Sequence, residues 1–319
     1  MHLAIMILMV MVTAAFITRS EAKEGYPNKP IQIICPFPAG GALDQFARIT
    51  ASKLEPLLGE KVIVLNKTGG GGTTGTAWAA QQKPDGYTLL VVAPGPLTSR
   101  TIVEKVPYSY KDFEYIAQLC TAEEIVAVQA DAPWKTIEEF IEDARKNPGK
   151  YSYATSGAGS MGHILMETLK DSYKLDVTHI AFKGSAPAIT ALLGGHVQLC
   201  VAEGVFEPHV KAKTVRQIFT GIASKYKINP NIKNFGDLGH DIDIDAWGGL
   251  CAPKGTPKEI IKKLDTSCKT ISGDESYKEM LRNIGAVTLY MDADDFSKKV
   301  ERNYLLFKRM LDKLGLSAK

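Results

Sequence analysis

The sequence predicts an α/β protein with two lobes, each built on a mainly parallel sheet with helices packed against it. Three observations support this prediction. Short apolar runs alternate with segments of helical periodicity, many of the 28 glycines follow directly after the apolar runs, and 319 residues supply enough chain for two domains. Strands that alternate with helices pair in parallel and are joined by right-handed crossovers.

The first half of the chain has strand–helix–strand–helix–strand order. Its predicted elements are a strand at 31–35, a helix at 42–58, a strand at 62–65, a helix at 73–82 and a strand at 87–93. The loop Pro36–Gly41 and the segment Asn66–Gly72 connect strands to helices and are rich in turn-forming residues.

The same construction recurs after Pro133. The predicted elements are a helix at 136–146, a strand at 151–154, a helix up to 172, a strand at 177–182, a helix up to 193, strands at 197–202 and 214–223, and helices at 257–271, 275–284 and 293–314. Thr256 is expected to cap the first of these last three helices, with Pro257 at its first position.

Composition and charge exclude several classes of protein. Hydrophobic residues make up 45% of the chain and charged residues 23%, which excludes a disordered, a collagen-like or a polytopic membrane protein. Thirty-eight Lys and Arg stand against 35 Asp and Glu, so the net charge of +3 gives no electrostatic footprint for nucleic acid.

The N-terminal segment is expected to direct export. Residues 3–17 are apolar apart from Thr13, a length that suits a signal peptide better than a membrane span. Ser20 and Ala22 are small residues with the spacing of a cleavage site, so residues 1–22 are expected to be removed. An uncleaved anchor is the alternative, and either way the body of the protein is exported.

The five cysteines form no C-x-x-C pair, and four of them lie in apolar runs. Buried free thiols are therefore expected rather than a disulfide framework.

Four predicted loops share one construction that favours an anion. The loops are 37–44, 68–74, 155–160 and 183–186, and each connects a strand end to a helix start. In an open parallel sheet such loops gather at the carboxyl edge, where ligands bind. Helix starts expose unpaired amide N–H groups, and glycine lets a ligand approach the backbone closely. Two such groups facing each other across a cleft would hold a small anion, most simply a carboxylate. The alternative is that the glycines only form tight turns.

Catalytic and cofactor motifs are incomplete. Gly70, Gly72 and Gly75 match the spacing of a dinucleotide fingerprint, but the next strand ends at Ala93 without the acidic residue that binds the ribose. The G-x-S-x-G pattern fails at Ser156 and Ser160, and the six histidines show no metal-ligand spacing. We therefore expect no enzyme, no cofactor and no metal site.

The residues also carry a family resemblance. The segments that carry it are Tyr26–Ile31, Pro36–Gly41 with Asp44, Asn66–Gly69, Pro84–Leu89, Ser156–Ser160 with His163, Phe182–Ala188, Leu193–Val197, Trp247–Leu250 and Ala252–Pro257. Together, and in this order, they resemble the substrate-binding proteins of tripartite tricarboxylate transporters, the Bug-type extracytoplasmic receptors.

The resemblance implies a type II periplasmic-binding-protein fold with a ligand cleft between lobes 23–121 plus 222–319 and 122–221. It implies a periplasmic or otherwise extracytoplasmic monomer that captures a di- or tricarboxylate or an aromatic acid for a membrane permease. By position, it assigns ligand contact to Phe37, Ala39, Gly40, Gly41, Asp44, Gly71, Thr155, Ser156, Ala158, Lys183, Gly184 and Glu203. For Asp44 two readings stay open, organiser of its loop or direct ligand contact.

The sequence departs from the family pattern at three places. Lys67-Thr68 stands where Arg-Pro is usual, and Cys35 stands where an aliphatic residue is usual. Glu203 would repel a carboxylate unless it is protonated or paired, so it either recognises an amino or hydroxyl group of the ligand or faces solvent.

Hinges are expected near 119–123 and 221–223. The rival functions are an exported dinucleotide-dependent oxidoreductase and a sensory ligand-binding domain.

Overall fold

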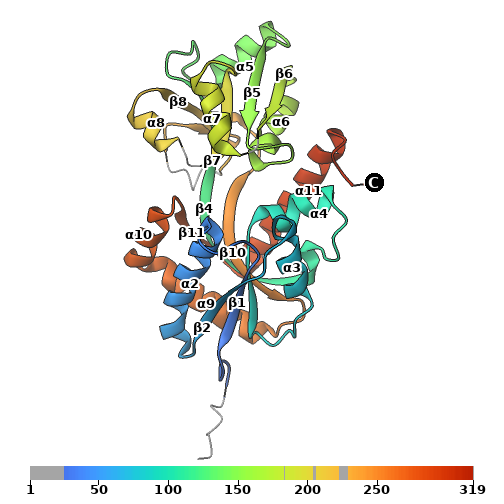
Figure 1. Ribbon diagram of the computed structural model, residues 1–319, viewed down its shortest axis with the longest axis vertical. Coiled ribbons are helices and arrows are strands. Elements are labelled where there is room, and N and C mark those ends of the chain that lie inside the picture. The colour runs from blue at the N-terminus through green and yellow to red at the C-terminus, as the bar shows by residue number, and fades with distance from the viewer. Residues whose placement is uncertain (1–24, 183, 204–205, 223–228, 319) are drawn as a thin grey trace, which may run out of the picture.

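The computed structural model describes residues 25–182, 184–203, 206–222 and 229–318, which form two α/β lobes joined end to end (Figure 1). The side chains of Glu203 and Glu207 are outside this description. The predicted fold class is confirmed. The expected signal peptide lies outside the described residues.

The first lobe is a mixed sheet between two layers of helices. Its strand order is β2-β1-β3-β10-β4, and β11 also pairs with β4. The strands are β1 (Ile31–Cys35), β2 (Val62–Asn66), β3 (Thr88–Val92), β10 (Asp245–Pro253), β11 (Val287–Met291) and the first part of β4 (Phe113–Gln129). The helices are α2 (Ala42–Leu58), α3 (Thr73–Ala80), α4 (Arg100–Val103), α9 (Lys258–Gly273), α10 (Glu275–Asn283) and α11 (Ala293–Lys313).

Alternation along β1 builds the two cores of this lobe. Ile31 and Ile33 face a cluster that contains Phe46 of α2, whereas Ile34 faces the other side with Phe296 of α11. Successive side chains of a strand point to opposite faces, so a continuous apolar strand is buried on both.

The second lobe repeats the architecture around the far end of β4. The order β4-β7-β5-β6 is completed by β8, which pairs with β4, and by β9, which pairs with β8. The strands are β5 (Tyr151–Thr155), β6 (Val177–Ala181), β7 (Leu199–Glu203), β8 (Val215–Thr220) and β9 (Lys233–Asn234). The helices are α5 (Ile137–Lys146), α6 (Met161–Tyr173), α7 (Ser185–Leu193) and α8 (Glu207–Lys211).

Strand direction makes the two lobes face each other. β10 is antiparallel to both β3 and β4, so β4 runs parallel to β1, β2 and β3. In the second lobe β7 is antiparallel to β4, and β5 and β6 are parallel to β7. The carboxyl ends of β1–β3 and of β5–β7 therefore point toward one another.

The register along β4 measures the separation. The end of β3, Val92, is level with Gln118, because both pair with Gly249. The end of β7, Glu203, pairs with Glu124. These two levels are six residue steps apart along β4, which at about 3.3 Å per residue is about 20 Å. We call this space, with its walls of strand-end loops and its floor of 118–124 and 245–249, the interlobe cleft.

Helix α11 contacts the cores of both lobes. Phe296 and Val300 in its first half belong to a core cluster of the first lobe, whereas Phe307 and Leu311 in its second half belong to the main cluster of the second lobe. Figure 1 shows this helix beside the crossing strands.

Three local details differ from the sequence prediction. The crossing strands β4 and β10 run antiparallel to their neighbours, so among the described strands the parallel pairs are those within β1–β3, those within β5–β7, and the short pair of β8 and β9. Helix α9 begins at Lys258 with Pro257, not Thr256, as its N-cap. Strand β8 ends at Thr220, and β9 beyond it pairs with β8 in the second sheet.

All five cysteines are buried as free thiols. Within the described part of the chain, no helix is both long enough and apolar enough to cross a bilayer.

Candidate ligand-binding cleft

Asp44 organises the loop of the first lobe. Gly41 is the N-cap of α2 but supplies no side-chain cap, and Asp44 in the first turn lies 2% exposed. Its Oδ2 accepts hydrogen bonds from the Gly40 amide (2.8 Å) and Arg48 Nε (3.0 Å), and its Oδ1 accepts one from Asn66 Nδ2 (2.7 Å). Burial alone would raise the pKa of Asp44, but these donors lower it to about 2. The geometry favours the reading as loop organiser over direct ligand contact.

The loop that Asp44 holds presents open backbone. Ala39, Gly40 and Gly41 are exposed, and Gly40 adopts φ +84° with no atom within 4 Å of a Cβ placed there. The Ala39 amide makes no hydrogen bond with any residue that the structure describes. Phe37 is half-buried, and its carbonyl accepts from Asn66 Nδ2 (2.9 Å). The loop therefore offers amide dipoles to a ligand without a side chain in the way.

The glycines after β2 have packing roles that differ from one another. A Cβ on Gly75 would lie 2.2 Å from the Lys67 carbonyl oxygen, so this glycine lets α3 pack against the end of β2. Gly72, at φ +100°, fits against Pro96 and the Phe37 ring. These contacts account for Gly72 and Gly75, two of the three glycines of the dinucleotide-like motif, by packing.

Gly71 lies beside a cation that the sequence analysis did not single out. Gly71 is exposed, and a Cβ there would be 2.9 Å from an Arg100 guanidinium nitrogen. Arg100 begins α4, after the helical turn Gly95–Ser99 that follows β3, and pairs with Glu104 one turn later. The side chains of this pair are 44% and 40% exposed, so both remain accessible from solvent.

The facing loop of the second lobe, 156–160, is held from inside. The buried Thr155 hydroxyl donates to the Gly157 carbonyl (3.1 Å) and accepts from its amide (3.3 Å). The Gly159 amide donates to His163 Nδ1 (3.0 Å). Ala158 at the tip is exposed, and its amide makes no hydrogen bond within the described part of the chain.

The second loop of this lobe is tied to the first. The Gly184 amide donates to the Ser156 carbonyl (3.1 Å), and Gly184 has φ +114°. Lys183 lies outside the described residues, as does the side chain of Glu203. The backbone of Glu203 pairs with Glu124 at the floor of the cleft.

The cleft floor is a pair of strands with buried polar groups. Thr121 of β4 donates a short hydrogen bond to Asp245 at the start of β10, and both side chains are fully buried. Of the residues assigned by sequence, the structure thus brings Ala39–Gly41 and Gly71 to one wall and Ser156, Ala158 and Gly184 to the other. Asp44 and Thr155 lie behind these walls as supports.

Arg100, Asn66 and His179 are the residues that sequence reasoning missed. Asn66 carried a signal, because it ends a strand beside the predicted site. Arg100 follows a strand end only after an intervening turn, and His179 lies within a strand, so their sequence positions did not mark them. Among the described residues, no group of three or more His, Cys, Asp or Glu could hold a metal ion.

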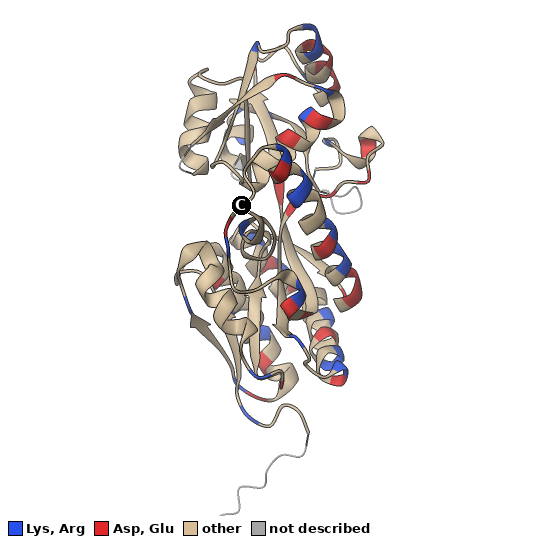
Figure 2. Ribbon diagram, turned by 90° about the vertical axis from the view of Figure 1, so that its right-hand side faces the viewer, with Lys and Arg blue, Asp and Glu red and all other residues tan. Residues whose placement is uncertain are grey.

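Outside the cleft, positive and negative side chains lie close together on several helices. Figure 2 shows Lys and Arg mixed with Asp and Glu along the helices on one side of the molecule.

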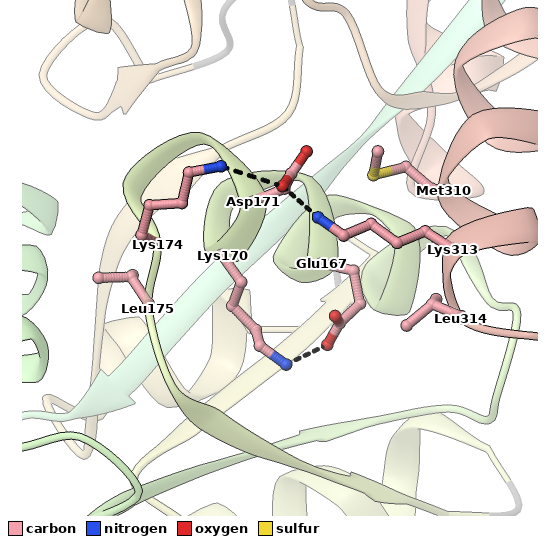
Figure 3. A pocket seen from close by; sticks show the side chains of 8 residues that line it. All are labelled: Glu167, Lys170, Asp171, Lys174, Leu175, Met310, Lys313 and Leu314. Carbon is pink, nitrogen blue, oxygen red and sulfur yellow. Dashed lines mark hydrogen bonds and ion pairs between the residues drawn. The ribbon is translucent and has the colours of Figure 1, made fainter.

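A hollow of about 300 Å³ lies away from the cleft between α6 and α11 (Figure 3). Its lysines already have acidic partners: Lys170 with Glu167 (2.5 Å), and Lys174 and Lys313 with Asp171. This hollow therefore offers an anion little uncompensated charge.

Comparison with known proteins identifies relatives that share this architecture. A protein from Cupriavidus necator, named for its position in the gbd 5′ region, is 32% identical over 305 residues, 95% of this chain and 93% of that protein. A TctC solute-binding protein from Polaromonas, solved without ligand, is 29% identical with a TM-score of 0.86, covering 91% of this chain and all of that one. An R. palustris protein solved with adipate is 26% identical with a TM-score of 0.69, covering 92% and 99%. The family model described as tripartite tricarboxylate transporter family receptor matches residues 46–316. The chain belongs to this receptor family.

Proposed function

We propose that this protein captures a small organic carboxylate in the interlobe cleft and delivers it to the membrane permease of a tripartite transporter. One observation carries the proposal: strand-end loops of two lobes point at each other, with the amides of Ala39 and Ala158 free to bind an anion. Such amides recognise negative charge through their fixed dipoles.

The comparisons support both the ligand class and a moving cleft. A relative of 26% identity holds adipate, a dicarboxylate. The unliganded relative matches this structure with a TM-score of 0.86, against 0.69 for the adipate-bound one at similar identity. A change of angle between lobes would produce such a difference, and ligand-driven closure requires contacts that exist only in the closed state.

The ligand contacts proposed are the walls of the cleft. In the first lobe the exposed backbone of Ala39, Gly40, Gly41 and Gly71 contacts the ligand, with the amide of Ala39 as a free donor, because the Gly40 and Gly41 amides already bond to Asp44 and Pro38. Ser156, Ala158 and Gly184 contact the ligand from the second lobe. Phe37 and Thr155 shape the loops around them. Lys183 and Glu203 stay proposed contacts by position, because their side chains are outside the described residues.

We propose the lobe division on the basis of strand pairing. We take the outward crossing to lie at Leu119–Glu123, where the sequence predicts a hinge. The return crossing lies at the start of β10, because β9 still pairs with β8 and Phe235 packs on Phe219 in the second lobe. We therefore assign residues 229–244 to the second lobe, beyond the boundary between 221 and 222 that the sequence analysis expects.

Export and the permease partner follow from the family. A receptor that delivers a solute to a permease must work outside the cytoplasmic membrane, and the apolar segment 3–17 would direct it there. Cell fractionation of the native chain, with peptide mass spectrometry of its mature N-terminus, tests this part. Recovery of the intact chain in the cytoplasm would contradict it.

A ligand screen tests the function itself. Adipate, citrate and benzoate, with NAD and NADP as dinucleotide controls, are added in a thermal-shift assay, and native mass spectrometry identifies any copurifying molecule. An acid present at one hundred times its Kd stabilises the protein by about 2.7 kcal/mol, which raises Tm measurably. Stabilisation by a dinucleotide alone would overturn the proposal in favour of the oxidoreductase.

A further inference from the structure

Two histidines stack behind the loop 156–160. His163 lies in the first turn of α6 and His179 lies in β6, with ring centroids 3.9 Å apart and planes 14° from parallel. The Tyr153 ring of β5 stacks beside this pair, with its centroid 4.9 Å from that of His179 and 6.5 Å from that of His163. Three rings from three elements thus form one cluster directly behind a wall of the cleft.

Both imidazoles are bonded to the loop or to its support. His163 Nδ1 accepts the hydrogen bond from the Gly159 amide at 3.0 Å, which requires that this nitrogen carry no proton. His179 Nε2 lies 2.8 Å from the Thr155 hydroxyl, and that hydroxyl holds Gly157. The two glycines that flank Ala158 are therefore fixed through the histidine pair.

The surroundings favour the neutral pair. On α6 the nearest charges are Glu167 and Lys170, which bond to each other at 2.5 Å, and the Tyr153 hydroxyl also donates to Glu167 at 2.6 Å. The carboxylate that could stabilise an imidazolium is thus already engaged. Burial lowers the pKa of His163, and burial followed by the neighbouring His163 lowers the pKa of His179 to about 4.

We propose that His163 and His179 are positioning residues, which hold the 156–160 loop in its ligand-binding form only while they are neutral, so that acidification weakens ligand binding. This inference rests on the proposed function. A proton on His163 Nδ1 would turn the acceptor of the Gly159 bond into a donor facing a donor. A second proton would set two positive rings 3.9 Å apart.

One effect opposes this direction. A charged histidine near the cleft attracts an anionic ligand through space, which alone would make binding tighter at low pH. Solvent in an open cleft screens that attraction, whereas the Gly159 bond is made at a histidine that is 4% exposed. Loss of the loop geometry therefore outweighs the added charge.

Isosteric variants separate the role of the acceptor from the role of the proton. In His163→Asn the side-chain oxygen replaces Nδ1 as an acceptor that does not titrate near neutral pH, and in His179→Gln the amide replaces Nε2. His163→Leu fills the space without an acceptor. His196→Asn, at an exposed histidine of the same lobe, is the matched control.

The affinities of adipate, citrate and benzoate are measured by calorimetry at pH 7.5 and pH 4.5, with folding checked by Tm. Each result is expressed as the ratio of wild-type to His163→Asn affinity, because titration of the ligand's own carboxyl groups cancels. We expect the ratio to fall by about threefold or more on acidification, with His196→Asn behaving as wild type. His163→Leu should bind about tenfold more weakly at both pH values, the equivalent of one hydrogen bond.

Exchange of the Gly159 amide, followed without ligand in wild type and His163→Asn, gives an independent readout. The protection of this amide should decrease as the pH is lowered in wild type but not in His163→Asn, after correction for the intrinsic pH dependence of exchange. A wild-type ratio that is unchanged or rises, or equal protection in both proteins, overturns this inference and leaves the proposed function intact. His179→Gln decides the same point if His163→Asn does not fold. Failure of all three acids to bind wild type overturns the proposed function instead.

Discussion

The carboxylate of Asp44 makes more hydrogen bonds than its position in the first turn of α2 requires. Two amide donors and one guanidinium converge on it, and they connect the loop before α2 with the end of β2. Hydrogen bonds to a charged acceptor stabilise a protein by about 1.5–3 kcal/mol. The side chain therefore fixes the first wall of the cleft from behind.

We expect Asp44→Asn to lower the free energy of unfolding by about 2 kcal/mol at pH 7, and to weaken ligand binding. Because the folded pKa is about 2, below the ordinary 3.8, the stabilisation is full above about pH 5 and is lost as pH falls toward 2. Urea unfolding at pH 2.5 to 7 should show the two proteins converging at low pH. Asp294→Asn, in the first turn of α11, removes a similar charge at an exposed site and is the control. A difference independent of pH, or none, would contradict the role.

Arg100 is a candidate residue for direct recognition of an anionic ligand. Its guanidinium lies against Gly71 in the first lobe's loops and forms a solvent-exposed ion pair with Glu104. Because an exposed ion pair contributes little to folding stability, the guanidinium can bind an anionic ligand in the cleft at little cost to the fold.

Arg100→Gln should therefore weaken binding of the preferred acid by about fivefold to tenfold, at the scale of one charged contact, with Tm unchanged. The affinity of wild type should also fall more steeply with added salt than that of the variant. Lys105→Gln, an exposed cation nearby, controls for general loss of charge. Equal affinity of wild type and Arg100→Gln would remove Arg100 from the site.

At the scale of elements, the sequence predicted those whose pattern is local. The strands β1, β5 and β6 begin within a residue of their predicted positions because each is an apolar run followed by turn formers. The sequence predicted a chain crossing near 119–123, but it did not predict that β4 pairs with β10 there or that the return crossing lies in β10. The paired residues of β4 and β10 lie more than a hundred positions apart in sequence, as Asp245 and Glu123 show, and no local pattern encodes that distance. Arg100 and His179 were missed for the same reason, because only the fold brings them to the loops.

Helix α11 is attached to the crossing strands by buried polar groups. Lys299 is 1% exposed, and its Nζ lies 2.7 Å from Asp245 Oδ1 and 3.2 Å from Asp243 Oδ2. One turn on, Asn303 accepts from the Trp247 indole (2.8 Å) and donates to the Asp243 carbonyl (3.0 Å). Burial would lower the pKa of Lys299, but the two aspartates raise it above its usual value, so the amine stays charged.

Lys299→Met should lower the free energy of unfolding by about 3 kcal/mol or more, because it leaves Asp245 as a buried charge without its cation. The double variant Lys299→Met with Asp245→Asn should recover part of this loss. Lys298→Met, one residue earlier and 66% exposed, should change stability by less than about 0.5 kcal/mol. Denaturant unfolding measures all three, and equal losses at 298 and 299 would show that the buried pair does not anchor the helix.

At the scale of the whole molecule, the three interlobe connections define the motion that ligand binding can drive. β4 and β10 cross as paired strands, and α11, about 31 Å long for its 21 residues, is buried in both cores. The lobes can therefore rotate about this side of the molecule but cannot separate along it. Rotation brings the facing loop walls together, and a dicarboxylate that touches both walls favours the rotated state because its second set of contacts exists only there.

Small-angle scattering of the unliganded protein and of the protein saturated with its preferred dicarboxylate measures this rotation. The radius of gyration should decrease on binding, toward the value of about 20 Å expected for a compact chain of this size. Acetate, which has one carboxylate and is too short to touch both walls, should leave the dimensions unchanged at saturation. If the dicarboxylate binds without contraction, the site lies within one lobe and the facing strand ends do not form a closing cleft. If acetate produces the same contraction, closure responds to charge on one wall alone, and contact with the second wall is not what stabilises the closed state.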